Sequence, residues 1–163
     1  MRALGIDPMQ QMTQSIAADN AVIDGISAVT FGIHLCRGNV RRMWHREGGY
    51  DAIAEMLFNN LHHDRFLLEY DTNRAGGFGP LRFVPKDKIV VLGLVSTKIP
   101  QLELADDVKR HIEAANHFIP FEQLALSPQC GFSSNIVGNL ISEDDQWRKL
   151  ELIQKVAADV WGN

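Results

Sequence analysis

The alternation of strand-like and helix-like segments is the feature that most limits what this chain can fold into. Segments rich in β-branched and aromatic residues predict four strands, at 28–36, 65–70, 88–95 and 123–127. Apolar residues at helical spacing predict helices at 9–28, 50–61 and 103–118 and from residue 142 onward. Strands that are separated by helices pair in parallel, so the pattern predicts an α/β fold.

The length of the chain then restricts the architecture. With 163 residues it is shorter than the roughly 200 or more that a (β/α)₈ barrel, or TIM barrel, needs. Four strands cannot close an eight-stranded barrel, so the pattern leaves two architectures open: a small open sheet or half of a barrel. No repeat, low-complexity tract or linker divides residues 1–163, and we therefore expect a single domain.

Composition excludes several classes of protein. A net charge of −4 argues against non-specific binding of nucleic acid. No apolar run approaches the roughly 18 residues that cross a bilayer, so no membrane partner is expected. Two cysteines, Cys36 and Cys130, are too few for a disulfide scaffold, and they predict a reducing, cytoplasmic setting.

Potential metal ligands fall where the predicted strands end. His34 and Cys36 share one face of the first strand, because side chains alternate along a strand. Glu69 lies at the end of the second strand, and Cys130 follows the fourth. Parallel strands end at the same edge of a sheet, where α/β folds place their sites, so these four side chains are expected at one end.

The four residues form a chemically coherent set of ligands. Zinc binds cysteine thiolate, histidine nitrogen and carboxylate oxygen, usually four at a time. Two thiolates, a neutral imidazole and a carboxylate around a divalent ion sum to −1, and the sum stays −1 if an incoming thiolate displaces the carboxylate. Cysteine and histidine also occur in strands simply as packing residues, so the spacing alone leaves both a metal site and plain packing open.

Four segments together resemble a known family. They are GIHLCRGN from Gly32, LLEYDTNRAG from Leu67, VVLGLVSTKIPQLE from Val90 and LSPQCGF from Leu126. In this order they resemble the C-terminal catalytic domain of cobalamin-independent methionine synthases, and more closely the short methionine-synthase-like proteins of that superfamily. The resemblance implies one zinc ion bound by His34, Cys36, Glu69 and Cys130. It implies that this chain is the C-terminal half of a (β/α)₈ barrel, strands five to eight.

The resemblance also implies an activity, namely transfer of a methyl or alkyl group from a small-molecule donor to a zinc-activated thiol, as in methionine biosynthesis. One difference from the family's sequence bears on the identity of the methyl donor. Where the family has Tyr-Asp-Ile-His-Ser, this chain has Leu92 to Ser96, with Gly93 in place of the Asp and Val95 in place of the proton-transferring His. This argues against methyl transfer from a folate. A coenzyme M-type alkyltransferase and a non-catalytic zinc-binding half-barrel fragment remain as alternatives.

The missing strands predict how the chain assembles. The family's earlier strands, which contact the amino-acid thiol, have no counterpart here, so the sequence is expected to be a truncated reading frame or a fragment. The first and fourth strands would then be unpaired edges, which are templates for pairing with another chain. We therefore expect either a homodimer or association with the missing N-terminal half of the barrel.

Overall fold

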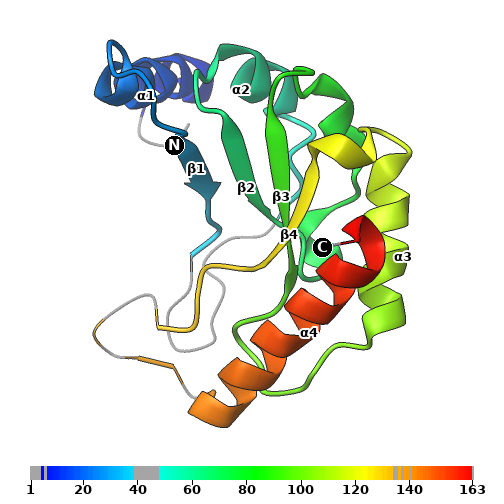
Figure 1. Cartoon of the computed structure of the whole chain (residues 1–163). Coiled ribbons are helices and arrows are strands. Elements are labelled where there is room, and N and C mark those ends of the chain that lie inside the picture. Colours follow the sequence, from blue (N-terminus) through cyan, green and yellow to red (C-terminus); the bar gives the residue numbers. More distant parts are fainter. Residues whose placement is uncertain are drawn as a thin grey trace.

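Four parallel strands in one open sheet form the centre of the molecule. The computed structural model describes residues 5, 7–38, 48–133, 136, 138–139 and 141–162. The strands are β1 (Gly32–Leu35), β2 (Arg65–Glu69), β3 (Ile89–Val95) and β4 (Leu124–Pro128), and they lie in the order β1-β2-β3-β4 (Figure 1). Each strand pairs in parallel with the next, so β1 and β4 are the edges of this sheet. The predicted α/β class is confirmed.

Helices connect the strands in the predicted order. Within the described residues they are α1 (Pro8–Ile23), α2 (Ala54–Asn60), α3 (Ala105–Asn116) and α4 (Glu143–Trp161), together with the 3₁₀ helices η2 (Asn73–Ala75), η3 (Gly79–Phe83) and η4 (Phe121–Gln123). None of the helices in the described part of the chain is long and apolar enough to cross a membrane.

Local signals set the ends of the helices. The Asp7 side chain accepts a hydrogen bond from the Met9 N–H, and Pro8 occupies the first turn, as the sequence of α1 suggests. α1 ends earlier than the predicted residue 28, because Gly25 and Ala28 both take positive φ values, of 84° and 63°, and no α-helix continues through that conformation. The strand that follows, β1, is also shorter than the predicted 28–36.

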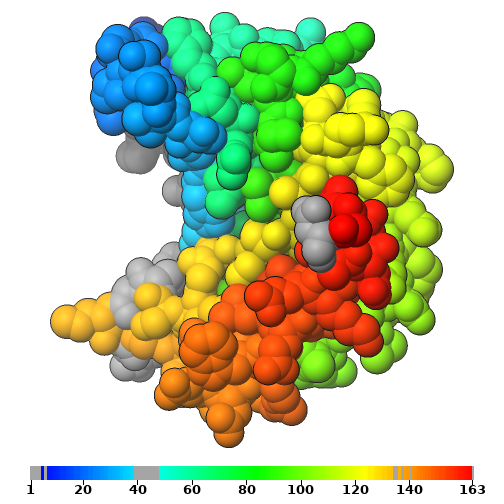
Figure 2. Space-filling view, in the orientation of Figure 1, coloured from blue at the N-terminus to red at the C-terminus, as the bar shows by residue number. Residues whose placement is uncertain are grey.

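One face of the sheet is open. Figure 2 shows the molecule hollowed on one side, between α1 and the segment that follows β4. In β1, the alternate residues Gly32 and His34 are exposed, and Cys36 just beyond the strand is exposed as well. The sequence predicts burial of β3 on both faces, and this is wrong for its first half, where Ile89 and Val91 are only partly buried. No further strands lie against this face in the described structure to complete their burial.

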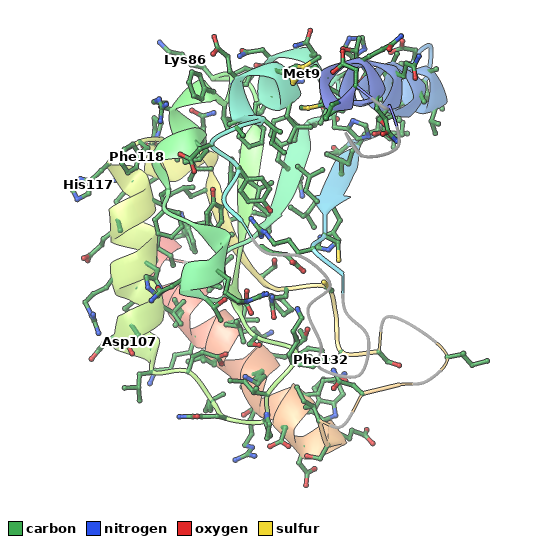
Figure 3. The ribbon with its side chains drawn as sticks, turned by 180° about the vertical axis from the view of Figure 1, so that it is seen from behind. Met9, Lys86, Asp107, His117, Phe118 and Phe132 are labelled. Carbon is green, nitrogen blue, oxygen red and sulfur yellow. The ribbon has the colours of Figure 1, made fainter. Side chains whose placement is uncertain are left out.

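The helices lie on the other face and at the ends of the sheet. Viewed from behind, α3 runs along the outside of the sheet, between Asp107 near its start and His117 just after its end (Figure 3). Met9 and Lys86 lie at the amino end of the strands, whereas Phe132 lies at the carboxyl end. The loops that could build a site therefore gather around the end marked by Phe132.

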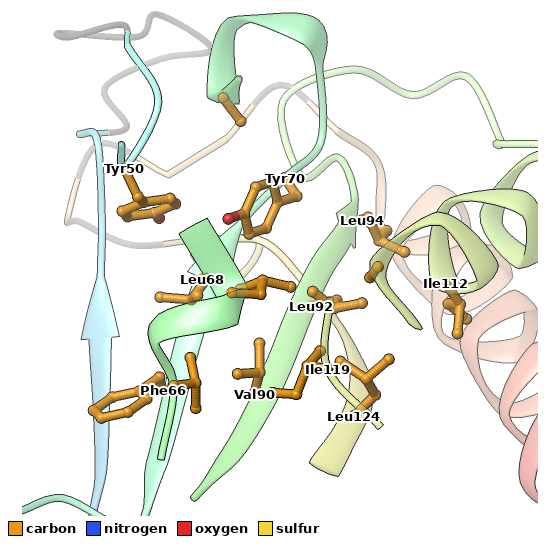
Figure 4. Close-up of a cluster of buried hydrophobic side chains, with 14 of the residues drawn as sticks. Tyr50, Phe66, Leu68, Tyr70, Val90, Leu92, Leu94, Ile112, Ile119 and Leu124 are labelled. Carbon is orange, nitrogen blue, oxygen red and sulfur yellow. The ribbon is translucent and has the colours of Figure 1, made fainter. Parts of the chain in front are cut away.

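Alternate strand residues pack beneath this helical layer to form the core (Figure 4). The residues of β2 and β3 on this face have exposures of 0–3 % and are Phe66, Leu68, Val90, Leu92 and Leu94. Ile112 of α3 and Leu124 of β4 close the cluster from the outside and the side. The two-residue period puts Leu67 and Val91, which are only partly buried, on the open face.

The packing of α4 differs from the prediction in one respect. Its apolar pattern predicts that Trp147 lies on the buried stripe, but Trp147 is 55 % exposed, so this prediction is wrong. Lys149 takes the buried position instead, with no exposed surface, beside Leu152 and Val156. The helix is therefore rotated relative to the stripe that its apolar residues suggest.

Candidate metal centre

The structure brings the four predicted ligand residues together at the carboxyl end of the sheet. His34 lies in β1, Cys36 follows it, Glu69 ends β2 and Cys130 follows β4. Each offers one ligand atom, and all four atoms lie within 4.8 Å of one another. The Sγ atoms of Cys36 and Cys130 are 3.1 Å apart, and His34 Nε2 is 4.0 Å from Glu69 Oε1. Cys130 Sγ also hydrogen-bonds to Glu69 Oε1.

These separations are close to those found around a tetrahedral ion. Zinc bonds of about 2.0–2.3 Å place neighbouring ligand atoms roughly 3.3–3.8 Å apart. The distance between the sulfurs, 3.1 Å, is shorter than that range, and the distance between the nitrogen and the oxygen, 4.0 Å, is longer, so the side chains would shift by a few tenths of an ångström to hold an ion. Two sulfurs, one imidazole nitrogen and one carboxylate oxygen form a donor set suited to zinc and unsuited to magnesium or calcium, which prefer oxygen alone.

The ligands differ in their access to solvent. Glu69 is 1 % exposed, whereas the His34 side chain is 36 % exposed and Cys36 faces the open side of the sheet. Burial, with the hydrogen bond to Glu69 as the next cause, raises the pKa of the Cys130 thiol above its ordinary range. A cation held between these side chains would act in the opposite direction, because a metal favours the thiolate. The Gly38 N–H donates a hydrogen bond to Cys36 Sγ at 3.1 Å.

Arg37 and Tyr50 support the end of β2, and the sequence analysis did not identify either of them. Arg37 is 9 % exposed and Tyr50 5 %. The Arg37 backbone N–H donates to Glu69 Oε2 at 3.1 Å, which leaves Oε1 turned toward Cys130 and His34. Burial, the largest cause, raises the pKa of Tyr50 to about 12, so its hydroxyl stays protonated at neutral pH. Arg37 belongs to the GIHLCRGN segment, but no periodicity distinguishes a buried arginine there.

A second buried network joins the ends of β3 and β4. Gln129 Oε1 accepts hydrogen bonds from Ser96 Oγ at 3.1 Å and from the Thr97 N–H at 3.2 Å. The Ser96 N–H donates to Glu103 Oε1 at 2.8 Å, and Lys149 Nζ of α4 donates to Glu103 Oε2 at 2.8 Å. Since Gln129 directly precedes Cys130, this network fixes the backbone from which that thiol projects.

Packing at the end of β3 accounts for Gly93, which stands where the family has an aspartate. A side chain at Gly93 would place its Cβ 2.9 Å from the Leu68 carbonyl oxygen, closer than real Cβ atoms approach. An aspartate at this position would therefore require the backbone to move. Val95 is fully buried and carries no proton to transfer. The pairing of β3 with β4 is also irregular between these two residues.

Comparisons with known proteins point to longer chains. No protein-family model matches the chain. It is 47 % identical over 165 residues to the uncharacterized protein YxjH of Bacillus subtilis, covering 99 % of this chain and 43 % of that protein. It is 48 % identical over 144 residues to the uncharacterized protein YxjG of the same organism, covering 88 % and 38 %. The chain thus spans less than half the length of these relatives.

Solved structures show the same relation. A Listeria monocytogenes protein, provisionally described as a vitamin-B12-independent methionine synthase, matches 98 % of this chain and 44 % of its own, with 31 % identity and a TM-score of 0.73. A B12-independent methionine synthase from Shewanella, solved with selenomethionine, matches 90 % and 42 %, with 18 % identity and a TM-score of 0.73. The second likeness concerns the fold alone. The chain thus has the architecture of half of a methionine-synthase-like (β/α)₈ barrel, with a sheet that is not closed.

Proposed function

We propose that this chain is part of a zinc-dependent thiol alkyltransferase related to the cobalamin-independent methionine synthases. One observation carries the proposal. His34, Cys36, Glu69 and Cys130 come from three different strands and still place four ligand atoms within 4.8 Å of one another. A packing role for these residues would not require two sulfurs, an imidazole and a buried carboxylate to converge on one point. The likeness to the Listeria protein supports the same assignment.

The bound zinc would lower the pKa of a thiol substrate and so supply the thiolate nucleophile. The residues of the chain would hold and adjust this centre. The exposure of His34 and Cys36 leaves the ion open to a substrate from the concave side of the sheet. Glu69 Oε2 accepts a hydrogen bond from the Arg37 N–H, so Oε1 would be the oxygen that holds the ion. Neither cysteine forms a disulfide, so both thiols are available as ligands.

The donor is inferred from what the end of β3 lacks. Val95 cannot protonate a leaving amine, and Gly93 leaves no space for an acidic side chain. We therefore favour a donor other than methyltetrahydrofolate, with homocysteine, a coenzyme M-type thiol or another small thiol as the acceptor. A non-catalytic zinc-binding role is the second candidate, and the open sheet face favours it, because the described residues do not enclose a substrate.

The open face is also where we expect a partner to bind. Apolar residues of β3 and the exposed face of β1 would be covered by four further strands in a complete barrel. We propose that these strands come from the N-terminal half of a longer protein or from a second copy of this chain. An enzyme would need those additional strands to bind its substrate, whereas the four proposed zinc ligands all lie in the present chain.

Zinc content tests the proposal directly. We expect one zinc ion per chain by elemental analysis after removal of loosely bound metal. Cys36→Ser and Cys130→Ser should each lower the zinc content sharply, and His34→Asn should lower it as well. His117→Asn is the matched control, because His117 is an exposed histidine far from the centre (Figure 3). Full zinc content in both cysteine variants would refute the assignment.

A thiol-binding test separates the two candidate functions. In the protein loaded with Co²⁺ instead of zinc, an added thiol that binds the metal changes the sulfur-to-cobalt charge-transfer absorption. A saturable change with a small alkyl thiol supports the transferase. Zinc binding without any thiol-dependent change, when the N-terminal half is present as well, supports the non-catalytic role.

A further inference from the structure

We propose that Arg37 and Tyr50 are positioning residues that hold the metal ligands of β1 against the ligand of β2. This inference rests on the proposed zinc centre. β1 has only four residues and is an edge of the sheet, and its ligand side chains are exposed. An edge strand this short is not held in place by packing on its open side. Something else must therefore keep His34 and Cys36 at a fixed distance from Glu69.

Tyr50 supplies the first link. Its hydroxyl donates to the Leu35 carbonyl oxygen at 3.2 Å and accepts from the Glu69 N–H at 3.1 Å. Leu35 directly precedes Cys36, and Glu69 is the ligand of β2 itself. A single buried hydroxyl thus joins the two strand ends at the point where the ligands leave them.

Arg37 supplies the second link, on the other side of Cys36. Its Nη1 donates to the Glu69 carbonyl oxygen at 2.7 Å, and its Nε donates to the Gly48 carbonyl oxygen at 3.0 Å. Its guanidinium carbon lies 4.3 Å from the centre of the Tyr50 ring, in a cation–π contact. Both neighbours of Cys36 in the chain are therefore bound to Glu69, one through Tyr50 and one directly.

The two links act on geometry as well as on stability. Groups that orient metal ligands typically change metal affinity by about 10- to 100-fold when they are removed. Neither Arg37 nor the Tyr50 hydroxyl is itself among the four ligands that converge on the centre. Their loss should thus leave the ligand set intact while loosening the spacing of Cys36 and His34 from Glu69. That outcome differs from the loss of a ligand, which removes a metal bond altogether.

Tyr70 provides a matched control. Its ring lies 5.5 Å from that of Tyr50, it is equally buried at 5 % exposure, and its hydroxyl has no hydrogen-bond partner among the described residues. Tyr70→Phe removes a buried hydroxyl from the same cluster without breaking a link between the strands. Tyr50→Phe removes a hydroxyl that makes two such bonds and keeps the ring.

The experiment measures zinc affinity by competition with a chelator and the d–d absorption of the Co²⁺-loaded protein. We expect Tyr50→Phe to weaken zinc binding by at least about 10-fold and to shift the cobalt bands. Arg37→Met should do the same, with partial rescue by Arg37→Lys, which keeps the charge but cannot reach several carbonyls at once. Tyr70→Phe should match the wild type in both measurements.

The outcomes separate this inference from the proposed function. If the wild type binds no zinc, the proposed function fails and the positioning role fails with it. If the wild type binds zinc and Tyr50→Phe and Arg37→Met bind it equally well with unchanged cobalt spectra, only the positioning role is overturned. An equal loss of zinc affinity in Tyr70→Phe would also overturn the positioning role, because the loss would then come from disturbed packing of the buried tyrosines. Should Tyr50→Phe not fold, the Arg37 pair decides in the same two measurements.

Discussion

Replacement of Lys149 by methionine tests how α4 is attached to the loop that follows β3. The Lys149 side chain is fully buried, and its ammonium donates to the Gln101 carbonyl oxygen at 2.7 Å and to Glu103 Oε2 at 2.8 Å. Lys149→Met keeps the volume and the apolar stem of the side chain and removes only the charge and its two bonds. The variant therefore leaves Glu103 without its cation.

The expected cost follows from these contacts. A hydrogen bond to a charged group contributes about 1.5–3 kcal/mol, and breaking a buried ion pair costs about 3–5 kcal/mol. Glu103 is 20 % exposed and keeps its bond from the Ser96 N–H, so the lower end applies. We expect a loss of about 3 kcal/mol in the free energy of unfolding, which corresponds to roughly 6–12 °C in melting temperature for a chain of this size.

Urea denaturation followed by circular dichroism measures this loss. Lys155→Met is the control, because Lys155 is an exposed lysine on the same helix and its removal should change stability by no more than about 0.5 kcal/mol. Adding Glu103→Gln to Lys149→Met should recover part of the loss, because it removes the unpaired charge and keeps an acceptor for Ser96. If Lys149→Met proves as stable as Lys155→Met, the buried ion pair does not hold α4 in place.

Three further predictions concern activity, pH and assembly. Because Val95 carries no transferable proton, the purified chain should transfer little methyl group from methyltetrahydrofolate to homocysteine, and robust turnover in a radiolabel assay would contradict this. Burial lowers the pKa of His63, so the unfolded chain binds a proton more readily than the folded one, and stability should fall as the pH drops through about 6.5. Thermal melts of wild type and His63→Asn across that range should show the steeper loss in the wild type; equal slopes would exclude His63 as the cause. Because the sheet has an open face, the isolated chain should dimerise or aggregate in light scattering across a concentration series, and a sharply melting monomer at micromolar concentration would count against this.

Much of the fold follows from local patterns in the sequence. The four strands and four helices occur in the order that the apolar periodicity predicts, because a period of two or of about 3.6 residues reflects burial of one face of the local element. The convergence of the four candidate ligands was also predictable. Once the strands are parallel, their carboxyl ends share one edge, and residues placed there by sequence must meet.

Other features depend on contacts between residues far apart in the chain. Trp147, which was expected to be buried, is exposed, and Lys149 is buried in its place. The carboxylate of Glu103, 46 residues before Lys149, accepts a hydrogen bond from the buried ammonium group. A periodicity within one helix carries no information about such a partner. The strain that a side chain would cause at Gly93 likewise arises from the Leu68 carbonyl on the neighbouring strand.

The hydrogen bonds that support the candidate metal centre were decided by the tertiary structure alone. In the sequence Arg37 is one basic residue in a polar stretch, and Tyr50 is one aromatic residue at the start of a predicted helix. Only the folded chain places the Tyr50 hydroxyl between Leu35 and Glu69, which are 34 residues apart in sequence and lie side by side in the sheet. The residue types that can bind zinc are written in the sequence. The distances between them are set by hydrogen bonds that form only when the strands have paired.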